Sequence, residues 1–197
     1  YKVQISAFRI DRFEVTNEEY CKFLNDGNAG YWTPWYRGIK RDEDGRFQPA
    51  QSDWAKLPVG CVNHYQARGY AEWAGKRLPT EAEWEFACRA GSHSRFSYGD
   101  HEANLGDYAW YRSKGGMNTN PVGEKKANGL GLYDMHGNVW EWCLDWYAAG
   151  SYAQRSGTVA NPLVEPESDK LFPRVSRGGS WYDDVEKLRS TARFKST

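Results

Sequence analysis

The stretch at residues 131–142, which reads Gly-Leu-Tyr-Asp-Met-His-Gly-Asn-Val-Trp-Glu-Trp, most constrains what this chain can fold into. Its apolar residues follow neither the period of an amphipathic helix nor the strict alternation of a half-buried strand. Two glycines, Gly131 and Gly137, favour turns with unusual backbone angles. An irregular turn that is dense in polar groups is therefore expected at this point of the chain.

The same stretch offers oxygen ligands for a hard cation. Asp134 and Glu141 supply carboxylates, and a turn at Gly137 and Asn138 exposes backbone carbonyls. Calcium takes about six to eight such oxygens in a flexible cage. The alternative is a buried turn whose carboxylates accept hydrogen bonds from loop amides, and one acidic loop does not decide between the two.

The composition excludes several classes of function. The 26 basic and 26 acidic residues cancel, and no long block of like charge occurs, so neither nucleic acid nor an anionic membrane is an expected partner. Mean hydropathy is −0.85, yet the chain holds 10 Trp, 13 Tyr and 8 Phe. Because each ring buries a large area, the core is expected to be built from aromatic rings. The length favours a single domain over residues 1–197.

No apolar run approaches the roughly 20 residues of a membrane span, so no direct membrane span is expected, and no signal peptide is found. The cysteines form no Cys-x-x-Cys pair and no zinc signature, and buried free thiols are expected. These cysteines are Cys21, Cys61, Cys88 and Cys143. The four histidines have no ligand spacing and are interpreted as structural; they are His64, His93, His101 and His136.

Three short helices are predicted from their capping residues. Thr16 with Glu19, and Thr80 with Glu83, have the spacing of capping boxes, and Asn63 is a third N-cap. The predicted helices cover residues 17–24, 64–74 and 81–90.

Two strands are predicted, at residues 2–10 and 175–181. Three glutamates open the third helix and are interpreted as stabilising its dipole rather than as a catalytic cluster. They are Glu81, Glu83 and Glu85. Few helices, short strands and long loops together indicate an irregular, loop-rich α+β domain.

Three blocks of sequence resemble the sulfatase-modifying-factor family, whose best-known member is the formylglycine-generating enzyme. They are Arg-Leu-Pro-Thr-Glu-Ala-Glu-Trp-Glu at residues 77–85, the stretch at 131–142, and Arg-Val-Ser-Arg-Gly-Gly-Ser-Trp at 174–181. The resemblance implies a C-type-lectin-like fold, in which a small twisted antiparallel sheet is flanked by two or three helices. The family's closing Gly-Phe-Arg strand is not found in the sequence.

The resemblance does not carry the family's oxidase activity to this chain. The formylglycine-generating enzyme binds copper through a cysteine pair just after its Gly-Gly-Ser block, and residues 181–188 hold no cysteine here. Soft Cu(I) selects thiolates, so no copper is expected. The family's bridged cysteine matches Cys88, but its partner position holds Ser190, so that bridge is not expected.

The resemblance does favour calcium. The family binds this ion through positions that match Asp134, Gly137, Val139 and Glu141, the middle two through their carbonyl oxygens. The predicted cofactor is therefore Ca²⁺, held at these four residues.

The replacement of the cysteine pair predicts a non-catalytic ligand-binding or display module. Residues 181–188 hold aromatic and adaptable polar side chains, as recognition surfaces do, and resemble the variable proteins diversified by retroelements. A protein or other macromolecule is the expected partner, at a bacterial cell surface or in the periplasm. The predicted ligand contacts are Trp140, Trp181, Tyr182, Asp183, Asp184, Glu186 and Lys187, with Phe194 and Ser196 as candidates for addition.

Three alternatives remain open from the sequence. In the first, residues 181–188 are an ordinary solvated loop that binds no partner. In the second, the chain is a cysteine-independent tailoring enzyme with a pocket at Trp140, Ser180 and Arg189. In the third, it is a structural lipoprotein of a bacterial envelope machine.

Overall fold

The computed structural model describes residues 2–112, 118–153, 155–165 and 173–196, and this part of the chain has an α+β architecture. Its α-helices are α1 (Asn17–Asn25), α2 (His64–Trp73), α3 (Glu81–Arg89) and the short α4 (Leu105–Tyr108). Its strands are β1 (Lys2–Gln4), β2 (Ile39–Arg41), β3 (Phe47–Pro49), β4 (Glu141–Trp146), β5 (Thr158–Ala160), β6 (Arg174–Arg177) and β7 (Phe194–Ser196). The predicted fold class is confirmed.

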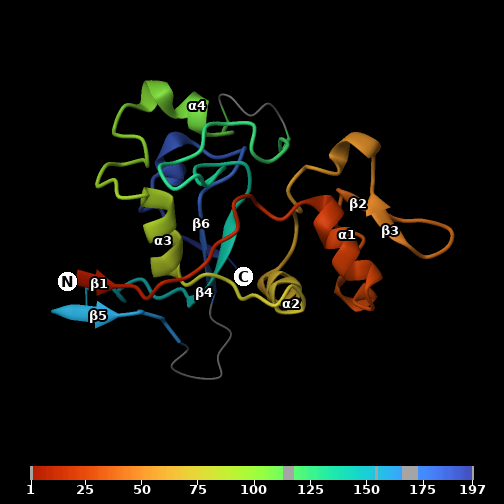
Figure 1. Cartoon of the computed structure of the whole chain (residues 1–197), viewed down its shortest axis with the longest axis horizontal. Helices are drawn as coiled ribbons and strands as arrows, with labels where there is room; N and C mark the ends of the chain where they lie inside the picture. The colour runs from red at the N-terminus through yellow and green to blue at the C-terminus, as the bar shows by residue number, and fades with distance from the viewer. Residues whose placement is uncertain (1, 113–117, 154, 166–172, 197) are drawn as a thin grey trace.

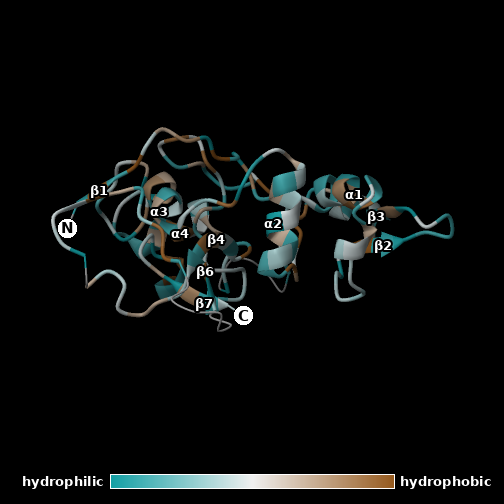
Figure 2. Cartoon of the chain, turned by 90° about the horizontal axis from the view of Figure 1, so that it is seen from below, coloured by the Kyte–Doolittle hydropathy of each residue, from teal (hydrophilic) through white to brown (hydrophobic). Residues whose placement is uncertain are grey.

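The central sheet is antiparallel, with strand order β4-β6-β7. Helix α3 packs beside β4 and β6, whereas α1 and the β2-β3 hairpin lie toward the other end of an elongated molecule (Figures 1 and 2). A separate parallel pair joins β1 to β5. Within the described residues no helix is long and apolar enough to cross a bilayer.

All three predicted helices form, and their caps explain where they begin. The Thr16 side chain accepts from the Glu19 amide while the Glu19 carboxylate accepts from the Thr16 amide. The same reciprocal pair forms at Thr80 and Glu83, and Asn63 makes it with Gln66. Each box satisfies amides that the first helical turn would otherwise leave without a partner.

Both predicted strands are shorter than expected. The first ends at Gln4, because its one neighbour, β5, is only three residues long. The second ends at Arg177, because Gly178 and Gly179 adopt φ angles of +94° and +81°, which leave the extended region. The prediction of strands over 2–10 and 175–181 was therefore wrong beyond these points.

Three hydrophobic clusters form the core. The first packs α1 against the β2-β3 hairpin and is largely aromatic; Tyr20, Phe23, Tyr36 and Phe47 are its buried rings. The second lies between α3 and the central sheet, and a third surrounds Leu105 and Leu188. The prediction of buried free thiols is correct for three cysteines and wrong for Cys61, which is exposed.

The glutamates of α3 do more than stabilise the helix dipole. Glu81 is buried and accepts two hydrogen bonds from Arg193, at 2.6 and 2.7 Å, just before β7. Arg177 of β6 is fully buried and pairs with Glu85. These ion pairs join α3 to the C-terminal half of the sheet, which the interpretation from sequence had missed.

Candidate functional site

The central turn, residues 131–142, is buried and conformationally unusual. Asp134 and Asn138 have φ angles of +57° and +63°, and Gly137 has a φ of +145°. A Cβ atom on Gly137 would lie 2.2 Å from the carbonyl oxygen of Trp110. The Asn138 amide donates to that same oxygen at 2.9 Å, so the turn needs glycine at this position.

Asp134 lies in the interior with an unsatisfied oxygen. The residue is only 2% exposed, and the Gly123 amide donates to its Oδ2 at 2.8 Å. Its Oδ1 is buried and has no hydrogen-bond partner within the described residues. Glu141 accepts a hydrogen bond from the Trp84 indole at 3.0 Å.

A third carboxylate, Glu14, joins these two, and sequence reasoning missed it. Its Oε1 accepts from the Val139 amide at 3.1 Å and its Oε2 from the Asn138 side chain at 2.7 Å. Glu14 precedes α1 and is 124 residues from Asn138. No local spacing connects positions so distant, and only the fold brings them together.

Burial raises the pKa of all three carboxylates, and neighbouring acids of the cluster add to the rise for Glu14 and Glu141. Burial raises the pKa of Glu14 well above its usual range, and the charges of Asp134 and Glu141 add to the rise. Burial, with Asp134 as a further cause, raises the pKa of Glu141 to about 7. Within the described residues none of the three pairs with a lysine or arginine. Buried like charges of this kind are stabilised by a bound cation or by protons.

The carboxylates of the turn could hold an oxygen-ligated ion only together with backbone carbonyl oxygens. In the part of the chain that the structure describes, no three acidic, histidine or cysteine side chains converge tightly enough to hold a metal by themselves. The amides that donate to Glu14 and to Asp134 Oδ2 are what the buried-turn alternative predicts. The unsatisfied Asp134 Oδ1, and the charges of Asp134 and Glu141 beside Glu14, are what an ion site completed by carbonyl oxygens would explain.

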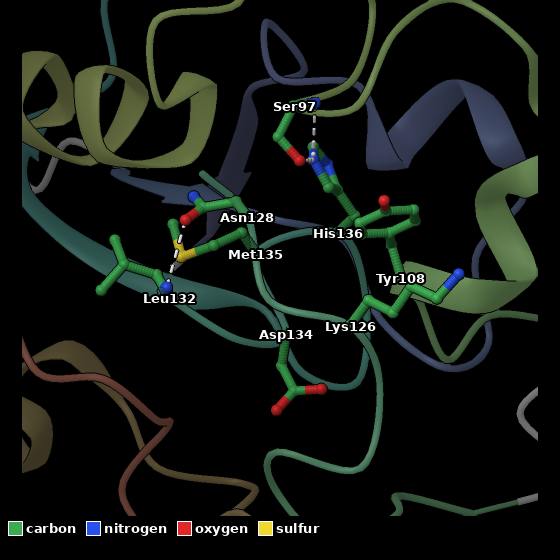
Figure 3. Close-up of a pocket in the computed structure, with 8 residues that line it drawn as sticks. All are labelled: Ser97, Tyr108, Lys126, Asn128, Leu132, Asp134, Met135 and His136. Atoms are coloured by element: carbon green, nitrogen blue, oxygen red, sulfur yellow. Dashed lines mark hydrogen bonds between the residues drawn. The ribbon is translucent and has the colours of Figure 1, made fainter. Parts of the chain in front are cut away.

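His136, in the same turn, is structural, as predicted. Its Nδ1 donates to the Leu188 carbonyl at 2.8 Å, and its Nε2 accepts from the Ser97 amide at 3.1 Å. Burial lowers the pKa of His136 to about 4, so the ring is neutral. Figure 3 shows the Asp134 carboxylate pointing away from His136 and Ser97. The histidine therefore takes no part in the acid cluster.

The C-terminal segment, residues 181–188, is attached to this turn. The Trp181 amide donates to the Asn138 carbonyl at 2.9 Å. The Asp183 carboxylate accepts from the Trp140 indole at 2.8 Å and from the Ser180 hydroxyl. The structure thus places Trp140, one of the predicted ligand contacts, against the segment.

Arg112 supports the segment from a loop about 70 residues earlier, and nothing in the sequence pattern pointed to it. Its amide donates to the Asp183 carbonyl at 3.2 Å, and its Nε donates to the Tyr182 carbonyl at 3.0 Å. Its guanidinium lies 4.6 Å from the centre of the Tyr182 ring.

Four side chains of the segment, those of Tyr182, Asp184, Glu186 and Lys187, face solvent. Tyr182 is 61% exposed, and the side chains of Asp184 and Glu186 are 70% and 64% exposed. Lys187 is exposed, with its Nζ 5.3 Å from the ring of Phe194, which in turn packs on Trp140 at 5.2 Å. A surface of rings and mixed charges results.

Among the described residues, neither Ser180 nor Cys88 has the surroundings of an activated nucleophile. The Ser180 hydroxyl donates to Asp183 rather than to a histidine. The Cys88 thiol is free and buried, and burial raises its pKa to about 12. An open cleft of about 470 Å³ lies between residues 11–22 and α2. None of the three residues of the pocket in the tailoring-enzyme alternative, Trp140, Ser180 and Arg189, lines this cleft.

The arrangement defines an α+β domain of the formylglycine-generating-enzyme type. The profile of the sulfatase-modifying factor enzyme 1-like domain matches residues 1–197, and the chain belongs to this family. The formylglycine-generating enzyme of Streptomyces coelicolor is 37% identical over 243 residues, covering all of this chain and 76% of that enzyme.

Other relatives place the same domain in different settings. The serine/threonine-protein kinase pkn1 of Chlamydia caviae is 35% identical over 206 residues, covering all of this chain and 31% of the kinase. The chain therefore spans about a third of the length of the chlamydial kinases it matches.

Solved structures agree with this assignment. The variable protein 1 of Treponema denticola superposes with a TM-score of 0.70 at 27% identity, over 93% of this chain and 77% of that protein. PvdO of Pseudomonas aeruginosa gives a TM-score of 0.72 at 28% identity, over 94% and 73% of the two chains.

Proposed function

We propose that this domain is a non-catalytic, calcium-stabilised binding module that displays residues 181–188 to a macromolecular partner. The observation that carries the proposal is the state of this segment. It holds no thiol where the enzyme of the family has its copper-binding pair, and it is anchored to the scaffold while its charged and aromatic side chains face outward. Anchored backbone with exposed rings and charges is typical of recognition surfaces.

In this proposal, calcium stabilises the central turn, to which residues 181–188 are attached. Asp134 and Glu141 would bind through carboxylates and Gly137 and Val139 through carbonyls, with Glu14 as a fifth group beside them. The ion would neutralise charges that the fold otherwise buries without a cation. Because the Trp181 amide binds the carbonyl of Asn138 in the same turn, a rigid turn fixes where the segment begins.

The variable protein of Treponema denticola supports display as the role of this scaffold, since its name describes a protein whose sequence varies on the same fold. We therefore propose a retroelement-diversified variable protein as the particular kind of module, with a protein as the preferred partner. An extracytoplasmic location suits a module of this kind, since extracellular modules bind calcium with dissociation constants of about 10⁻⁴–10⁻³ M.

The test is selection of a random-peptide phage library on the immobilised domain in calcium. Enriched peptides should lose binding when Tyr182, Asp184, Glu186 and Lys187 are all replaced by alanine. The control is the double change Glu18→Ala and Lys22→Ala, which removes an exposed ion pair on α1. Peptides that bind the quadruple variant as well as the wild type would contradict the proposal.

A second assay addresses the enzyme alternative. The copper-treated domain is incubated with a cysteine-containing peptide in air, and the peptide mass is followed. We expect no conversion of the cysteine to an aldehyde, because residues 181–188 offer no thiolate to Cu(I). Conversion would show that the domain is an oxidase after all.

A further inference from the structure

Along the C-terminal segment, exposed side chains are interspersed with side chains that are partly or fully buried. We infer that the segment consists of two interleaved sets of positions. The fixed positions (Asp183, Leu188 and, from outside the segment, Ser180 and Arg112) hold its shape, and the displayed positions (Tyr182, Asp184, Glu186 and Lys187) determine what it binds. The binding role of the displayed set rests on the proposed function, whereas the division itself is a property of the fold.

Asp183 is the central fixed position. Its carboxylate accepts hydrogen bonds from two side chains, and its amide donates to the Ser180 carbonyl at 3.0 Å. One of the two donors is the indole of Trp140, which precedes β4, so the bond ties the segment to the sheet. Loss of this carboxylate would leave an indole N–H and a hydroxyl without a partner.

Leu188 fixes the other end. It is fully buried in the cluster that contains Phe96 and Leu105, and its carbonyl accepts the hydrogen bond of His136. A short 3-10 helix, Val185–Leu188, leads into this anchor. The segment is therefore held at both ends and at its middle.

Arg112 is a positioning residue that spans the fixed and displayed sets. It binds two successive carbonyls, of Tyr182 and Asp183, through separate donors. Its guanidinium stacks on the Tyr182 ring and lies 3.4 Å from the Asp184 carboxylate. A planar guanidinium can bind a carbonyl, stack on a ring and contact a carboxylate at the same time. A lysine ammonium cannot make all three contacts, because lysine lacks the Nε donor and the flat face.

Within the described residues, the ion pairs that the displayed side chains make with the rest of the domain are solvent-exposed. Glu186 pairs with Arg95 at 2.6 Å and with Arg189 at 3.2 Å, at a side-chain exposure of 64%. Exposed ion pairs contribute little to stability, so these positions can change without unfolding the domain. An aromatic ring, two acids and one base in one row fit a polypeptide surface of mixed polarity better than a single anion or cation.

Single-site saturation with selection for protease resistance on yeast tests the division. Positions 112, 180, 182, 183, 184, 186, 187 and 188 are each changed to every residue. We expect most substitutions at the displayed positions to remain resistant and few to do so at Asp183 and Leu188. Equal tolerance at Asp183 and Tyr182 would overturn the inference.

Arg112 needs a second readout, because its loss need not unfold the domain. In Arg112→Ala, amide hydrogen exchange at residues 182–187 should rise about tenfold, as the loss of roughly one net hydrogen bond predicts. Arg112→Lys should stay close to the alanine variant, and Arg68→Ala, which removes a similarly exposed ion pair, should not change this exchange. Unchanged exchange in Arg112→Ala would contradict the positioning role. Neither measurement uses a ligand, so a failed phage selection would leave the division standing.

Discussion

The central turn and the C-terminal segment both contain acidic side chains, which are buried in the turn and exposed to solvent in the segment. Asp134 and Glu141 of the turn, with Glu14, are carboxylates without a cationic partner in the described residues, and burial raises their pKa. Asp184 and Glu186 of the segment are exposed, and arginines lie beside them. The residue types alone would not have separated these two regions.

The difference shows that burial decides what an acidic residue does in this domain. A buried carboxylate without a partner requires an ion or a proton, whereas an exposed one paired with arginine costs little and is free to recognise a ligand. The account therefore predicts large effects of change in the turn and small effects at the displayed positions.

The largest effect is expected at the turn itself. Gly137→Ala should destabilise the domain by about 3 kcal/mol or more, since the new Cβ meets the Trp110 carbonyl and a φ of +145° strains any other residue. Gly150→Ala, where a Cβ meets nothing within 4 Å, is the control. Chemical denaturation measures both, and equal small effects would mean that the turn is not tightly packed.

Calcium should stabilise the domain more at pH 7.5 than at pH 5. The pKa of Glu141 rises from its usual 4.5 to about 7 in the folded state without an ion, so this group destabilises the fold as pH rises through that window. On the proposed calcium site, the ion would bind the carboxylate and offset the loss, whereas at pH 5 it would have to displace a proton. Melting with and without calcium at both values measures the difference; an increment that is equal or larger at pH 5 would count against carboxylate ligands.

A moderate effect is expected at the anchor of the segment. Asp183→Ala should cost about 1–2 kcal/mol, because two donors lose their acceptor. Urea unfolding followed by the total tryptophan fluorescence of the domain, compared between the variant and the wild type, measures this loss. A change within error of the wild type would place Asp183 among the displayed positions instead.

The smallest effect is expected one residue further on. Asp184→Ala should change stability by less than about 0.5 kcal/mol, because the side chain is 70% exposed and its arginine contact is long. The same denaturation experiment serves as the check, and a loss as large as that of Asp183→Ala would erase the distinction between the two sets.

Local signals in the sequence predicted local structure well. The capping residues Thr16, Asn63 and Thr80 located three helices to within about a residue, because a cap and its partner lie one turn apart. Strand ends were less predictable, since the length of a partner strand and the backbone angles of Gly178 and Gly179 decide them.

The candidate sites were predicted only in part. Asp134 and Glu141 share one stretch and were found together, but Glu14 and Arg112 reach their sites from distant loops. Asp183 and Asp184 are neighbours with the same side chain, and only the fold shows that one points to Trp140 and the other to solvent. Periodicity carries no such information in an irregular segment.

The most direct test of the account is thermal melting of the chelator-stripped domain before and after calcium is restored, with calcium content measured in both samples. At about 100 times the dissociation constant, calcium should add about 2.7 kcal/mol of stability and raise the melting temperature by several degrees. The double variant Asp134→Ala and Glu141→Ala should show no such rise. A stripped, calcium-free wild-type domain whose melting temperature does not respond to calcium would contradict the claim that the central turn is an ion site.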